Sequence, residues 1–125
     1  PWGAAMRMMN KAVENGEAAF RRKDIDSEAL AELYRQRFLL ATRAGDRLRA
    51  QADLEAALAL EGVAPEVRAR LHRERGHLLF RGGLYHAAAD AFERALALTP
   101  GDAEAWRWHA EAMLRCRKPH RASTS

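Results

Sequence analysis

Apolar residues recur at intervals of three and four along most of the chain, which is the spacing of helices that each bury one face. In residues 4–22 this face carries Met6, Met9, Val13 and Phe20. The chain has few β-branched residues and no sustained alternation of apolar and polar residues, so the signals of strands are missing. The pattern therefore predicts an all-α protein.

Capping and breaking residues divide this pattern into six helices. They are expected at about residues 4–22, 27–44, 46–60, 65–80, 84–98 and 103–117. Gly45 breaks the second helix, Pro65 suits the first turn of the fourth, and Asp102 can cap the sixth. Six helices with short connections predict an antiparallel stack. Residues 118–125 carry charges and hydroxyl groups with nothing to bury, and we expect them to be disordered.

An internal repeat relates these helices to one another. Shifting the sequence by 38 residues places Gly45 on Gly83, Ala50 on Ala88, Leu54 on Phe92, Ala57 on Ala95, Leu58 on Leu96 and Leu60 on Leu98. Shifting it by 34 residues places Trp106 on His72, Ala110 on Gly76 and Met113 on Leu79. Small residues at repeated places indicate that another helix backbone passes close by. A bundle without repeats, with alanines at these places by coincidence, is the alternative.

These residues resemble the tetratricopeptide repeat, a pair of antiparallel helices of about 34 residues. The best unit, residues 69–102, carries Gly76, Leu79, Gly83, Tyr85, Ala88, Phe92, Ala95 and Pro100 at the family's places. It departs from the family at His72 and Arg75, where large apolar residues are usual. Residues 31–64 match less well, because Phe38 occupies a position where the family usually has a small residue. A third unit ends after one helix.

The resemblance implies about two repeats and a half repeat over residues 31–117, stacked as a short right-handed α-solenoid. Residues 1–30 are expected to form an N-terminal helix that caps the stack or ends a preceding repeat. The chain begins at Pro1 rather than at a methionine, so we expect it to be a fragment or a processed product.

The resemblance also implies a protein-interaction module, a scaffold or adaptor, whose first helices line a concave groove for a partner peptide or helix. By the family's geometry, the groove residues are Arg35, Leu39, Arg43, Arg70, Arg73, His77, Phe80, Arg81, Arg107 and Trp108. Their arginines predict an acidic ligand, held by an apolar anchor at Phe80 and Trp108. A polar face in contact with solvent alone is the alternative. The lysines and asparagines with which the chaperone-binding subclass holds a terminal carboxylate are not reproduced.

The unfinished third unit predicts an exposed apolar face on the last helix. Trp106, Ala110 and Met113 would lack the helix that covers this face in a complete repeat. Exposed apolar patches favour association, so a homo-oligomer formed through this half repeat is a second hypothesis. A spacer element within a larger protein is a related alternative.

Composition and motifs give little support to other functions. The chain has 21 lysines and arginines against 17 acidic residues, but only 7% aromatic residues, so nucleic-acid binding is not favoured. His72 and His77 lie about 140° apart around a helix and cannot hold one metal ion together. Cys116 has no catalytic partner pattern, and no acid–base pair is visible, so we expect neither an enzyme nor a cofactor. No apolar run is long enough to cross a membrane, and no signal peptide opens the chain, so we expect a cytoplasmic protein.

Overall fold

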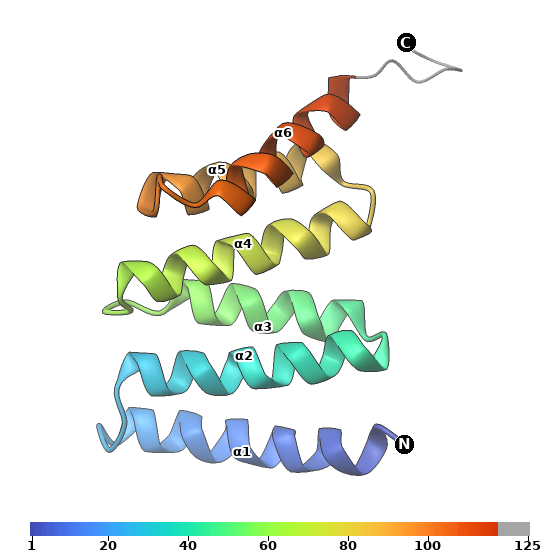
Figure 1. The fold of residues 1–125 in the computed structure, drawn as a ribbon. Coiled ribbons are helices and arrows are strands. Elements are labelled where there is room, and N and C mark those ends of the chain that lie inside the picture. Colours follow the sequence, from blue (N-terminus) through green and yellow to red (C-terminus); the bar gives the residue numbers. More distant parts are fainter. Residues whose placement is uncertain (118–125) are drawn as a thin grey trace. The chain divides into compact units, whose positions relative to one another are not determined.

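The structure is a computed structural model that describes residues 1–117, and within them it contains six helices and no strand. The helices are α1 (Gly3–Arg21), α2 (Ser27–Ala44), α3 (Arg47–Ala59), α4 (Pro65–Arg81), α5 (Tyr85–Leu98) and α6 (Ala103–Arg117) (Figure 1). The predicted all-α class of helix-turn-helix pairs is confirmed. The disorder expected for residues 118–125 concerns residues outside those described.

Local capping explains why the helix ends agree with the prediction. The Asp26 carboxylate accepts a hydrogen bond from the backbone N–H of Ala29 at 2.9 Å, and the Asp46 carboxylate accepts one from the backbone N–H of Arg49 at 3.0 Å. Gly45 ends α2 in the left-handed conformation, with a φ of 79° that a residue without Cβ adopts at no steric cost. These signals depend on neighbouring residues alone, and a sequence therefore reveals them.

The chain divides into two compact units, of which the first consists of residues 1–64. Within it α1 packs against α2 and α2 against α3, as neighbouring antiparallel helices (Figure 1). The largest core side chains are Val13, Leu30, Tyr34, Phe38 and Leu54. Gly16, which lowers the helix propensity of α1, is buried where a Cβ would meet the side chain of Leu33. The flexible Leu33 side chain thus fills the space beside Gly16.

A buried ion pair joins two helices of the first unit. The Arg37 guanidinium of α2 donates to both oxygens of Asp53 on α3, with a shortest distance of 2.8 Å, and Asp53 is 1% exposed. Arg37 also donates to the Asn10 side chain of α1 at 3.1 Å, and Arg49 lies 3.4 Å from Asp53. A bidentate pair of this kind fixes how the helices are rotated against each other.

The second unit begins at Pro65, and in it α5 packs against both α4 and α6. Ala88 and Ala95 of α5 are fully buried, as the repeat pattern predicted. Gly76 of α4 lies against the ring of Phe92, which is also fully buried. In the part of the chain that is described, no helix has the length and apolar character of a membrane span.

Candidate functional site

Five rings from the three helices of the second unit form what we call the aromatic cluster: His77 and Phe80 of α4, Tyr85 and Phe92 of α5, and Trp108 of α6. The rings meet edge to face. His77 lies between Phe92 and Trp108, with a centroid distance of 5.1 Å to each. Phe80 lies 5.3 Å from Trp108 and 5.0 Å from Tyr85. Such aromatic pairs contribute about 0.5–1.5 kcal/mol each beyond the area that they bury.

The cluster has a buried base and a partly exposed rim. Phe92 is inaccessible to solvent, whereas the other four rings are half-buried. Three of the predicted groove residues, His77, Phe80 and Trp108, therefore lie in contact with one another. They offer apolar area that a partner can cover.

Two arginines lie over the rim of the aromatic cluster. The Arg107 guanidinium is 5.0 Å from the centre of the Trp108 ring, and that of Arg115 is 5.3 Å from the centre of Phe80. Both stacks have cation–π geometry. Arg115 also donates a hydrogen bond to the Tyr85 hydroxyl at 3.3 Å.

Carboxylates of α6 accompany both arginines. Arg107 donates to Glu104 at 3.2 Å and Arg115 to Glu111 at 3.1 Å. A hollow of about 210 Å³ lies among Phe80, Arg107, Trp108, Glu111 and Arg115. Because pockets for whole small molecules have roughly 300–1,000 Å³, this hollow suits a single side chain better than a free ligand.

The other predicted groove residues have separate surroundings. Arg73 donates to Asp102 at 2.9 Å, and Asp102 also caps α6 by accepting from the Ala105 N–H at 3.1 Å. The guanidinium of Arg73 therefore links α4 to the start of α6. Because its charge is paired with Asp102, it attracts an acidic ligand less strongly than the sequence alone suggested. Arg70 and Arg81 are exposed on α4. Arg35, Leu39 and Arg43 lie on α2, in the first unit.

Burial favours the neutral form of both histidines of α4, because it lowers the pKa of each. Burial, and after it the charges of Arg81 and Arg73, lower the pKa of His77. Burial, followed by Arg68 and Arg94, lowers the pKa of His72, whose buried Nδ1 has no hydrogen-bond partner. His72 thus fills a place where a large apolar residue is usual, in accordance with its neutral state.

The exposed face of α6 lies away from the aromatic cluster. Trp106 is 53% exposed and Met113 36%, and Ala110 between them is exposed as well. The Trp106 indole donates to the Pro100 carbonyl at 2.8 Å, which fixes the ring at this surface. The side of α6 toward α5 instead buries Ala105 and Ala112. The predicted lack of a covering helix thus agrees with the exposure of this face in residues 1–117.

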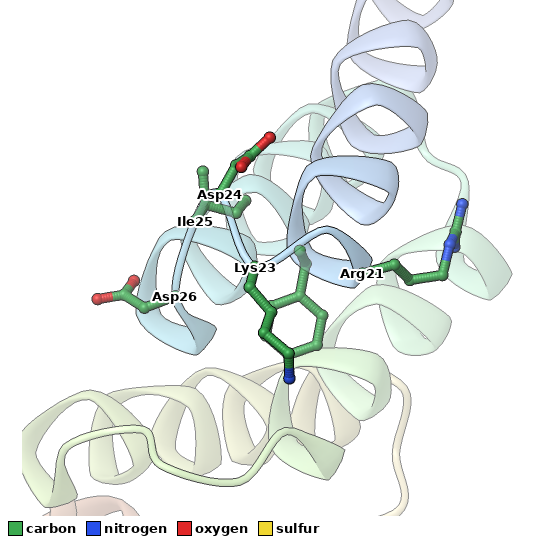
Figure 2. Close-up of a pocket in the computed structure, with 6 residues that line it drawn as sticks. Arg21, Lys23, Asp24, Ile25 and Asp26 are labelled. Carbon is green, nitrogen blue, oxygen red and sulfur yellow. The ribbon is translucent and has the colours of Figure 1, made fainter.

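A second hollow lies at the connection between α1 and α2, and its polar side chains do not point toward a common centre. It is lined by Phe20 and by residues 21 and 23–26. Figure 2 shows the labelled side chains of Arg21, Lys23, Asp24 and Asp26 pointing away from one another. Within residues 1–117, no three histidine, cysteine or acidic side chains are grouped so that they could hold a metal ion.

Sequence reasoning missed the contributions of Tyr85 and Arg115 to this site. Neither residue is among the predicted groove residues. Arg115 follows Trp108 by seven residues, so it lies on the same face of α6. That spacing was the signal that could have found it.

The comparison with family models gives one finding. Residues 69–112, which span most of α4, all of α5 and most of α6, match the model of the tetratricopeptide repeat. This match confirms the resemblance read from the sequence in that segment. No curated protein matches the chain.

Proposed function

Because residues 69–112 are a tetratricopeptide repeat, we propose that the chain is a protein-interaction module that holds a partner segment at the aromatic cluster. Repeats of this family generally mediate protein–protein interaction and are typically not enzymes. The observation that carries the proposal is the half-buried edge-to-face contact between Phe80 and Trp108, with a hollow of about 210 Å³ beside it. Partly buried aromatic side chains with arginine around them are the residue types that dominate binding energy at interfaces.

The partner inserts one apolar side chain into the hollow and carries acidic residues on either side. The ion pairs of Arg107 and Arg115 with Glu104 and Glu111 leave the hollow close to neutral, so an apolar anchor fits it better than a carboxylate. The exposed Arg70 and Arg81 on α4 supply positive charge farther along the surface. Exposed ion pairs contribute about 0–1 kcal/mol each, so these arginines act mainly on association rate and selectivity.

The proposed organisation has a helix in residues 1–30 followed by the repeats of residues 31–117. Within the first unit, Arg35, Leu39 and Arg43 of α2 are the residues that we propose to contribute to partner binding. Arginines 35, 73 and 107 occupy equivalent positions of the repeat in the sequence. The module works in the cytoplasm. Neither a cofactor nor nucleic acid takes part.

Selection from a library of random peptides tests this function directly. The selected peptides should share an aromatic or large aliphatic residue flanked by aspartate or glutamate. Phe80→Ala should weaken their binding about tenfold or more, because it removes one wall of the hollow. The control Leu114→Ala, which shortens a side chain that is 53% exposed on α6, should bind like the parent. Failure to select any peptide that depends on Phe80 would contradict the proposal.

A second candidate function is self-association through Trp106, Ala110 and Met113. The observation that favours it is the exposure of large apolar side chains along one side of α6. This surface faces away from the aromatic cluster, so both functions can operate in one molecule. Light scattering over a concentration series tests it, since a monomer mass at every concentration excludes self-association.

A further inference from the structure

The exposed face of α6 corresponds to the face with which α4 binds α5. In the 34-residue register, Ala110 takes the place of Gly76 and Met113 that of Leu79. Gly76 lies against the Phe92 ring of α5, and Leu79 shares a core cluster with Ala88 of α5. Within the described residues, α6 has no such helix on this side. Its face is therefore shaped to receive a helix that resembles α5.

Helix α1 carries the pattern that such a helix needs. Shifts of 38 residues relate Ala12 to Ala50 and Ala88, and Ala19 to Ala57 and Ala95. The four alanines of α3 and α5 are fully buried, whereas Ala12 and Ala19 of α1 are only half-buried. Within residues 1–117, therefore, the side of α1 that corresponds to the covered side of α3 and α5 is accessible. Large residues on α6 would meet small residues on α1.

The charges beside the two faces are complementary. A hollow of about 560 Å³ runs between α5 and α6, lined by His86, Ala89, Asp90, Glu93, His109, Met113, Cys116 and Arg117. Glu93 and Asp90, the latter paired with Arg94 at 3.0 Å, make its α5 side acidic. On α1, Val13 to one side of Ala12 is buried and Lys11 to the other side is exposed. A helix lying in the hollow with Ala12 toward α6 would turn Lys11 toward Glu93 and Asp90.

We propose that α6 of one molecule binds α1 of a second molecule, in the way that α4 binds α5 within a chain. The inference rests on the second candidate function and is independent of the aromatic cluster. Because the two surfaces differ, the contact is heterologous, and repeated contacts build open head-to-tail chains rather than a closed dimer.

Two face-specific variants test the pairing in the full chain. Met113→Glu places a charge on the α6 face, and Ala12→Glu places one on the α1 face, where it also lies beside acidic residues. Leu48→Glu is the matched control, since Leu48 is 82% exposed on α3 and belongs to neither face. Circular dichroism checks that all three remain helical. Sedimentation velocity over a concentration series then gives the mass of each protein.

The parent and the Leu48→Glu control should form species that grow with concentration, and each face variant alone should stay monomeric. An equimolar mixture of the two face variants should form a species of twice the monomer mass and nothing larger, because one intact face remains on each molecule. Self-association of Ala12→Glu at the level of the parent would overturn the pairing with α1 and leave self-association through α6 standing. A parent that is monomeric at all concentrations would overturn both.

Discussion

The Phe92 ring of α5 occupies the space in which a side chain at position 76 of α4 would lie. A Cβ built on Gly76 would meet three carbons of that ring at 2.8–2.9 Å, which is closer than real Cβ contacts come. The same ring is the buried base of the aromatic cluster, 5.1 Å from His77. The close approach of α4 and α5 and the position of the aromatic cluster thus depend on one pair of residues.

Gly76→Ala should therefore destabilise the protein. The ring is fully buried and cannot move away freely, and overpacking of this kind costs about 1–3 kcal/mol. The better helix propensity of alanine, about 1 kcal/mol, offsets only part of this cost. Urea denaturation measures the difference. Gly16→Ala is the matched comparison: its new Cβ meets the end of the flexible Leu33 side chain, so this variant should be at least as stable as the parent.

Breaking the buried Arg37–Asp53 pair should be among the most damaging single changes in the first unit. Asp53→Ala leaves the Arg37 guanidinium buried without its bidentate partner, which costs about 3–5 kcal/mol. Asp90→Ala removes an exposed pair with Arg94 and should cost about 0–1 kcal/mol. Urea denaturation midpoints of the two variants measure these losses, and that of Asp53→Ala should be the lower. Equal losses of stability would show that the Arg37–Asp53 pair is not buried in solution.

The lowered pKa of His77 makes stability depend on pH in a defined direction. The folded state holds the neutral imidazole, so the stabilisation is complete above the unfolded value of about 6.5 and is lost as the pH falls through the folded value. The free energy of unfolding should rise with pH between these two values. His77→Phe should lose less stability than the parent on acidification. His72 should account for part of the pH dependence that remains in this variant. Identical pH profiles for parent and variant would contradict this role of His77.

The sequence predicted most of the fold because the relevant signals are local or repeated. Asp26, Asp46 and Gly45 set helix ends through contacts within a few residues. The repeat register placed Ala88 and Ala95 of α5, like Ala50 and Ala57 of α3, where helices pack closely, and all four are buried.

The ion pairs could not be predicted in this way. Arg37 and Asp53 are ordinary charged residues in the sequence, and they meet only because α2 and α3 are rotated so that both point inward. Arg73 likewise meets Asp102 across 29 positions of sequence. The carboxylate with which an arginine pairs depends on side-chain conformations in the folded protein. A periodic pattern in the sequence contains no information on these conformations.

The most direct test of the central claim compares the two tryptophans of α6. Trp108 belongs to the aromatic cluster, and Trp106 lies on the opposite, exposed face of the same helix. The measured quantity is the dissociation rate constant of one peptide selected on the parent protein, with circular dichroism as a check of folding. Trp108→Ala should raise this rate constant about tenfold or more, and Trp106→Ala should leave it at the parent's value. Unchanged dissociation from Trp108→Ala, or an equal increase for Trp106→Ala, would contradict the claim that the aromatic cluster holds the partner.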